Sequence, residues 1–266
     1  MVSGNTPLPS AASAASAAVN QTWSTSAGNV NRPLPFRAVL FDFGQTLFQA
    51  PDAAALLTEA GVEPATAQRL WAEIWARALT PEELAKGRDL SEAAHRRHWM
   101  ELFAAAEPHA PGISRRLYEA VMRVESWTPF PDTPAVLAAL HEGGVAVGVL
   151  SNTAMALQPV LAVHGLDRYV SACVESFRLG IEKPDPRIFA AACEALGSKP
   201  EETLLVGDSH LADGAGVLAG LTVLLLPGVP RDTPRGLEAV LDLLQIRRPA
   251  PSQATPRNLR FRGDPA

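Results

Sequence analysis

The chain has 266 residues, of which 47% are hydrophobic, so it is long enough for one large domain or for one domain that carries an insertion. Its formal net charge of −5 argues against a nucleic-acid partner. The two cysteines form no metal-binding or disulfide pattern, which is typical of proteins in a reducing compartment. We therefore expect a cytoplasmic protein. No apolar stretch is long enough to cross a membrane.

Both ends of the chain have compositions that are typical of disordered tails. Residues 1–35 are rich in Ala, Ser and Asn and lack the basic start of a secretory signal. Residues 248–266 are rich in Pro and are basic. We therefore expect the folded part of the chain to lie between these two segments.

Five short apolar runs predict buried parallel strands. They span residues 37–42, 145–150, 169–174, 203–208 and 222–226. Their residues do not alternate between polar and apolar, as expected for strands that are covered on both faces. Helical patterns separate the later runs, and Asp132 and Asp185 are expected to cap two of these helices. The alternation predicts an α/β fold with a doubly wound, Rossmann-like parallel sheet.

The stretch between the first two strands follows a different pattern. From residue 51 to residue 127, apolar residues recur with helical spacing and no strand pattern interrupts them. This is too long for one crossover helix. We expect an all-helical insertion in a core made of residues 36–50 and 128–247. The large aromatic residues of the insertion are expected to pack in its own interior: Trp71, Trp75, Trp99 and Phe103.

Several polar residues stand at or near the predicted strand ends, where ligands bind in open α/β sheets. They are Asp42, Ser151, Asn152, Lys183, Asp208 and Asp213. Carboxylates from different strands make a hard oxygen site that suits Mg²⁺. A lysine and a hydroxyl beside them suit a phosphate. A carboxylate can also act as a nucleophile and form an aspartyl-phosphate.

Four segments in chain order resemble the motifs of the haloacid dehalogenase (HAD) superfamily of hydrolases. They are FDFGQTL, VLSNT, EKPDPRIF and LLVGDSHLADGAGVLAG, and the resemblance covers roughly residues 37–230. The helical insertion resembles the C1 cap of this superfamily. The resemblance implies a Mg²⁺-dependent hydrolase that acts on a small phosphorylated substrate.

By this resemblance, Asp42 would be the nucleophile and a metal ligand. The main-chain carbonyl of Gly44 and the carboxylate of Asp208 would be further ligands, and Asp213 would support both the metal and Lys183.

The resemblance also implies a phosphate site. Ser151 would hold the phosphate, with Asn152 nearby, and Lys183 would neutralise the charge between Asp42 and the phosphate. Two plainer alternatives remain open at this point. Ser151 could cap the next helix, and Lys183 could be a surface lysine of a loop.

The first motif departs from the family pattern Asp-x-Asp-x-Thr, because Gly44 stands where family phosphatases have their second aspartate. That aspartate is the general acid/base, which protonates the leaving oxygen and later activates water. Glycine has no proton to give, and the loss of a placed acid/base typically costs about 10²–10⁴-fold in rate.

Three interpretations follow. The first is a Mg²⁺-dependent phosphohydrolase with weakened or relocated acid catalysis. It would favour leaving groups that need no proton, such as those of acyl phosphates or anhydrides, or the cap would supply a carboxylate or histidine as the acid. The second is a metal-independent, dehalogenase-like hydrolase, although Asp208 and Asp213 beside Asp42 would repel each other without a cation. The third is a catalytically weak or silent protein that binds a phosphorylated ligand or a protein partner. The substrate and the oligomeric state are not readable from the sequence.

Overall fold

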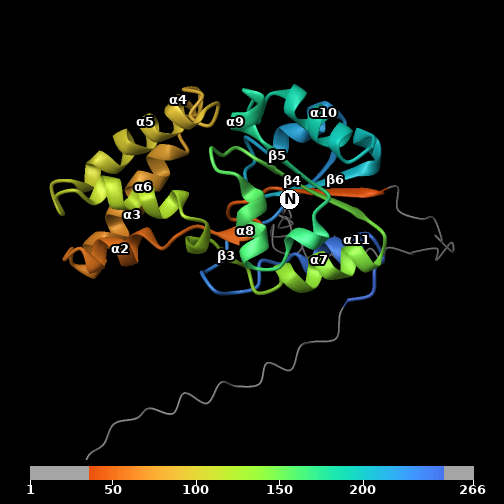
Figure 1. Ribbon diagram of the computed structural model, residues 1–266, viewed down its shortest axis with the longest axis horizontal. Coiled ribbons are helices and arrows are strands. Elements are labelled where there is room, and N and C mark those ends of the chain that lie inside the picture. The colour runs from red at the N-terminus through yellow and green to blue at the C-terminus, as the bar shows by residue number, and fades with distance from the viewer. Residues whose placement is uncertain (1–35, 249–266) are drawn as a thin grey trace, which may run out of the picture. The chain divides into compact units, whose positions relative to one another are not determined.

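A computed structural model describes residues 36–248, so the predicted tails lie outside the described residues, apart from residue 248. The centre of the fold is a parallel sheet of five strands (Figure 1). They are β1 (Ala38–Phe41), β4 (Ala146–Ser151), β5 (Ala172–Glu175), β6 (Thr203–Gly207) and β7 (Thr222–Leu225). Their order is β5-β4-β1-β6-β7, and all neighbours are parallel. The predicted Rossmann-like sheet is confirmed.

Strand β1 lies in the middle of the sheet and is buried on both faces, since none of its residues is more than 1% exposed. Val39 and Phe41 pack into one hydrophobic cluster and Leu40 packs into another. This explains why the run shows no polar alternation. The position of β1 also places Asp42, which follows it directly, at the centre of the carboxyl edge of the sheet.

Helices cover both faces of the sheet (Figure 1). The first cluster takes residues from α7 (Thr133–Glu142), α8 (Leu157–Val163) and α11 (Glu238–Leu243). The second takes residues from α10 (Pro186–Ala195), against which the 3-10 helix η5 (Gly214–Ala219) packs. The apolar stripes of these helices therefore meet the apolar faces of the strands, as in a doubly wound fold.

The insertion after β1 is all-helical, as predicted. Its helices are α2 (Ala53–Glu59), α3 (Pro64–Ala78), α4 (Pro81–Leu84), α5 (Glu92–Phe103) and α6 (Ile113–Met122), with the 3-10 turns η1 (Ala104–Ala106) and η2 (Val124–Ser126). They enclose a hydrophobic cluster of their own, in which Trp99 and Phe103 are buried and Trp71 and Trp75 are half-buried. This helical group is the cap. Its boundaries at residues 51 and 127 stay a prediction.

A short antiparallel ladder joins the two chain segments that enter and leave the cap. It pairs β2 (Phe48–Gln49) with β3 (Thr128–Pro129). Each strand has two residues, which is too short to produce a periodic pattern in the sequence. The ladder brings residues about to enter the cap next to residues that have just left it.

Two local predictions differ from the structure. Strand β5 begins at Ala172 rather than at residue 169, because Asp167–Tyr169 forms a 3-10 turn, η3. Asp132 precedes α7 but makes no side-chain cap. Its carboxylate instead accepts hydrogen bonds from the backbone N–H groups of residues 235, 236 and 237, at 2.8, 2.8 and 2.9 Å. Asp185 does cap α10, since it accepts a hydrogen bond from Arg187 N at 2.9 Å.

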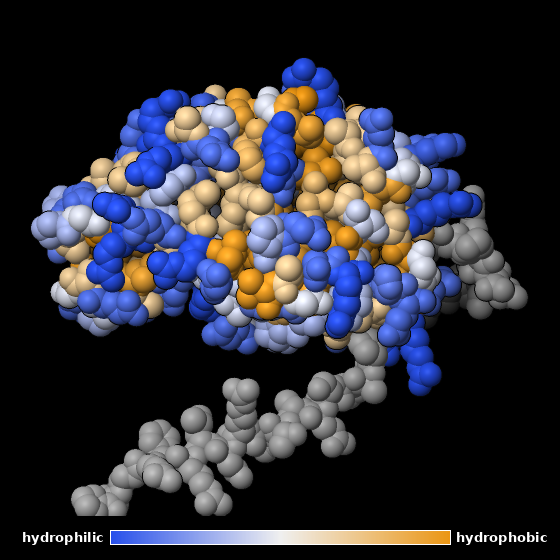
Figure 2. Space-filling model, viewed as in Figure 1, coloured by the Kyte–Doolittle hydropathy of each residue, from blue (hydrophilic) through white to orange (hydrophobic). Residues whose placement is uncertain are grey.

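The surface in view is mixed in character. Figure 2 shows hydrophilic residues spread over this face, with smaller hydrophobic areas between them. Within residues 36–248, no helix has the length and apolar character needed to cross a membrane.

Candidate active site

The first candidate residue, Asp42, is held where β1 ends. Its backbone N–H donates a hydrogen bond to Val206 O of β6 at 2.8 Å, so the chain stays in the sheet until this residue. The Asp42 side chain is buried. The chain then turns sharply: Phe48 N donates to Phe43 O at 2.9 Å, and Gln45 has the left-handed φ of 59°. This turn presents Asp42 and Gly44 to the same cavity.

Lys183 is buried between two carboxylates, so it is not a surface lysine. Its Nζ lies 2.7 Å from Asp42 Oδ1 and 2.6 Å from Asp213 Oδ1, and it also donates to Leu150 O at 3.0 Å. These three acceptors use all three donors of the ammonium group. The lysine therefore links the end of β1 to the segment after β6.

Asn152 fixes the backbone of Lys183. The Asn152 side-chain amide donates to Lys183 O and accepts from Lys183 N, both at 2.8 Å. Asn152, at the end of β4, thus holds the backbone of Lys183 in position. Ser151 is buried and lines the cavity, and α8 begins after Ala156, so Ser151 caps no helix.

Asp213 shapes the turn after β6. Its Oδ2 accepts hydrogen bonds from Asp208 N at 3.2 Å and Ser209 N at 3.0 Å, while its Oδ1 contacts Lys183. Asp213 is fully buried, whereas the Asp208 side chain is exposed to the cleft. Carboxylate oxygens of Asp42, Asp208 and Asp213 all lie within 4.8 Å of one another. The structure therefore brings together every residue that the motifs singled out.

The electrostatics of this cluster are dominated by burial. Desolvation raises the pKa of the Asp42 carboxyl to about 7, against the attraction of Lys183 and with added repulsion from Asp213 and Asp208. Desolvation and Asp213 also raise the pKa of Asp208. Burial alone would lower the pKa of Lys183, but Asp213 and Asp42 outweigh it and raise that pKa. The positive charges of the protein therefore do not fully offset the negative charges that Asp42, Asp208 and Asp213 carry when ionised.

This donor set fits a divalent cation. The three carboxylates outnumber the positive charges that act on them, which are the Lys183 ammonium in contact with two of them and the buried guanidinium of Arg235. In addition, no backbone N–H of the described residues donates to the carbonyl oxygen of Gly44. Carboxylate and carbonyl oxygens are the ligands that Mg²⁺ takes in proteins.

One feature of the site had no signal in the sequence. A Cβ atom placed on Gly44 would lie 3.7 and 3.8 Å from Cζ3 and Cη2 of Trp127. The Trp127 ring is fixed there, because its Nε1 donates to Val121 O at 2.8 Å and its ring packs on Phe43 with centroids 5.0 Å apart. An indole therefore stands beside the position at which a family phosphatase would carry its acid.

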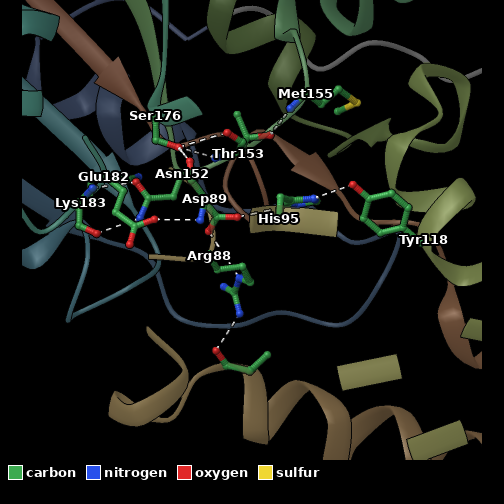
Figure 3. Close-up of polar contacts among 11 residues, drawn as sticks. Arg88, Asp89, His95, Tyr118, Asn152, Thr153, Met155, Ser176, Glu182 and Lys183 are labelled. Atoms are coloured by element: carbon green, nitrogen blue, oxygen red, sulfur yellow. Dashed lines mark hydrogen bonds and ion pairs between the residues drawn. The ribbon is translucent and has the colours of Figure 1, made fainter. Parts of the chain in front are cut away.

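A second missed feature is a polar cluster that joins the cap to the sheet domain (Figure 3). In the loop between α4 and α5, Asp89 N donates to Glu182 Oε2 at 3.0 Å, and Asp89 O accepts from Ser176 Oγ at 2.6 Å. Glu182 directly precedes Lys183 in the chain. The cap loop is thus fastened one residue away from the lysine that contacts Asp42.

The side chains of this cluster continue into the cap. His95 lies between Asp89 and Tyr118, with His95 Nδ1 3.2 Å from Tyr118 Oη and His95 Nε2 3.7 Å from Asp89 Oδ1 (Figure 3). Arg88 Nε lies 3.5 Å from Asp89 Oδ2. The only hint in the sequence is that the polar run KGRD interrupts the helical pattern.

Comparisons with known proteins agree with this geometry. The family model of the haloacid dehalogenase-like hydrolases matches residues 36–219. The chain is 31% identical over 235 residues to glyceraldehyde 3-phosphate phosphatase from Methanopyrus kandleri, covering 80% of this chain and 94% of that protein. It is 39% identical over 115 residues to phosphoserine phosphatase from Thermus thermophilus, covering 42% of this chain and 46% of that protein, so it spans less than half the length of that relative.

Solved structures show a similar fold. One is L-2-haloacid dehalogenase from Xanthobacter autotrophicus, with a TM-score of 0.59 and 23% identity over 74% of this chain and 80% of that one. This likeness concerns the fold.

The buried His95 predicts a dependence of stability on pH. Burial lowers the pKa of His95 from 6.5 to about 4, so between these values the unfolded chain binds a proton that the folded chain does not. The free energy of unfolding should therefore fall as the pH is lowered through this window, by on the order of 3 kcal/mol from this group. Urea unfolding of the wild type and of His95→Gln at several pH values measures it.

In His95→Gln, this part of the pH dependence should be absent. His109→Gln, which removes an exposed histidine of the cap, is the matched control and should behave as the wild type. Equal pH profiles for the wild type and His95→Gln would contradict the prediction.

Proposed function

We propose that this chain, which belongs to the haloacid dehalogenase-like hydrolases, is a Mg²⁺-dependent phosphohydrolase of a small phosphorylated molecule that works through an aspartyl-phosphate on Asp42. The observation that carries the proposal is the buried Lys183, whose Nζ contacts both Asp42 and Asp213, with the Asp208 carboxylate close by. The names of the phosphatase relatives support phosphate chemistry at such a site.

In this proposal, an Asp42 oxygen attacks the phosphorus atom and the bond to the leaving oxygen breaks. Lys183 holds the Asp42 carboxylate in place at 2.7 Å and offsets charge as the phosphate approaches. The Ser151 hydroxyl, buried at the end of β4, donates to a phosphate oxygen. Asp42, Asp208 and the Gly44 carbonyl would hold Mg²⁺, which supplies charge neutralisation on the phosphate oxygens when it is bound.

Gly44 sets the limits of this chemistry. It has no group that can protonate the leaving oxygen, so the first step favours leaving groups that depart as stable anions. It also has no base to activate the water that releases the phosphate from Asp42. The proposal therefore favours acyl phosphates and other anhydrides over alkyl phosphate esters, and it expects the second step to be slow.

The dehalogenase-like alternative is less well supported by the site. Displacement of a halide from carbon needs one carboxylate nucleophile and no cation. Here the carboxylates of Asp42, Asp208 and Asp213 converge within 4.8 Å, and the pKa values of Asp42 and Asp208 are both raised. Without a bound metal cation, the carboxylates of such a cluster are expected to repel one another.

Magnesium binding is testable on the folded protein without a substrate. Because a ligand that binds the folded state stabilises it, Mg²⁺ at about 100 times its Kd should add about 2.7 kcal/mol to the free energy of unfolding. Asp208→Asn should lose most of this gain. Asp185→Asn, which changes the capping carboxylate of α10, is the matched control and should keep it. Thermal unfolding with and without Mg²⁺ measures both, and equal gains in the two variants would contradict the metal site.

Restoring the missing acid tests the role of Gly44. An aspartate fits there, because its Cβ would make ordinary contact with Trp127 and Gly44 does not have a positive φ. Gly44→Asp should raise kcat/KM for an alkyl phosphate ester by about 10²-fold or more. Gly44→Asn is the matched control, since it has nearly the same shape and no acid. If the two variants hydrolyse the ester equally, the missing acid is not what limits the wild type.

A further inference from the structure

We infer that the group from which this enzyme removes phosphate is aromatic: a phosphorylated phenol or an aromatic acyl phosphate. This inference rests on the proposed function and adds the chemical class of the leaving group. Three features of the cavity carry it: the aromatic rings in its walls, the residue beside Gly44, and the charged residues of the cap loop that line it.

Several aromatic rings stand in the walls of the cavity. It has a volume of about 600 Å³ and extends from Asp42 and Lys183 into the cap. The phenylalanine and tryptophan rings that line it are those of Phe43, Trp71, Trp75, Trp99, Phe103 and Trp127. Neighbouring cap rings stand with centroids 5.2 to 6.2 Å apart: Trp71 with Trp75, Trp75 with Trp99, and Trp99 with Phe103. Such walls favour a flat apolar group, because aromatic rings attract one another beyond the effect of buried area.

The wall reaches the reacting end of the cavity. In family phosphatases, the residue at the position of Gly44 contacts the leaving oxygen. Here Trp127 borders that position, with ring atoms 3.7 and 3.8 Å from where a Cβ would be. The indole gives no proton to the oxygen, but it offers an apolar surface to the atoms attached to it. The leaving group thus meets a ring where it would otherwise meet an acid.

An aromatic leaving group fits both the apolar wall beside Gly44 and the absence of a proton donor. Without a proton donor, the leaving oxygen must carry its negative charge alone. A phenol has a pKa of about 10, as in tyrosine, against 15.7 for water, to which alkyl alcohols are close. An aromatic carboxylate is a still weaker base. The same ring that stabilises the departing anion also packs against Trp127 and Trp75.

The charged residues of the cap loop that line the cavity disfavour a second anionic group on the substrate. Arg88 of this loop is buried, with its guanidinium carbon 4.6 Å from the centroid of the Trp99 ring. Its charge is already paired with Asp89, at 3.5 Å. Glu182, which also lines the cavity, adds a carboxyl rather than a cation. A neutral ring therefore suits this part of the cavity better than a carboxylate or a second phosphate.

The test compares benzoyl phosphate with acetyl phosphate in the presence of Mg²⁺. Both release a carboxylate, so they differ mainly in the ring. The wild type should have a kcat/KM about tenfold higher for benzoyl phosphate. Trp75→Leu and Trp127→Leu should each lower the ratio of kcat/KM for benzoyl phosphate to kcat/KM for acetyl phosphate by about five- to tenfold. Tyr169→Leu, which removes an aromatic ring outside the cavity, should change neither substrate.

The outcomes separate this inference from the proposed function. If neither phosphate is hydrolysed, the proposed function fails and the inference fails with it. If both are hydrolysed with equal kcat/KM, or if neither tryptophan variant changes the ratio, the inference is overturned and the proposed function stands. Trp75 and Trp127 are both half-buried, so the folding of each variant is checked by circular dichroism, and Trp75→Leu tests the inference by itself should Trp127→Leu not fold.

Discussion

The contact of the Lys183 ammonium with Asp42 and Asp213 is the interaction on which the rest of the site depends. Burying these groups costs free energy unless each is paired. The pairing constrains the surrounding chain: Asn152 fixes the lysine backbone, and Asp213 also accepts from the N–H groups of residues 208 and 209. Three strand ends are thus locked around one buried charge, and Asp208 is left facing the cleft.

The cap completes the site from the other side, and the group that stands beside Gly44 is apolar rather than acidic. Trp127 leaves the cap and lies against Gly44, while the Asp89 backbone is held by Glu182 and Ser176 beside the lysine. Exclusion of water strengthens electrostatic interactions inside a site. Aromatic rings above a charged base therefore suit a reaction in which the protein binds the phosphate and the leaving group stabilises its own charge.

Features that depend on local sequence patterns could be predicted, whereas contacts between residues far apart in the sequence could not. Apolar runs predicted the five strands, and the family motifs predicted that Asp42, Lys183 and Asp208 would converge, because the carboxyl ends of parallel strands share an edge. The position of Trp127 beside Gly44 could not be predicted, since the two residues are 83 positions apart in the sequence. The same holds for Asp132, which bonds residues 235–237 rather than its own helix.

The central claim is that Asp42 takes the phosphate and, lacking an acid/base beside it, releases it slowly. Rapid-quench kinetics with acetyl phosphate and Mg²⁺ test this most directly. The account predicts a burst of about one acetate per active site, followed by slower turnover. Mass spectrometry of the quenched protein should find the phosphate on Asp42, and Asp42→Asn should show no burst. Turnover without a burst and without phosphate on Asp42, or with phosphate on another residue, would contradict the claim.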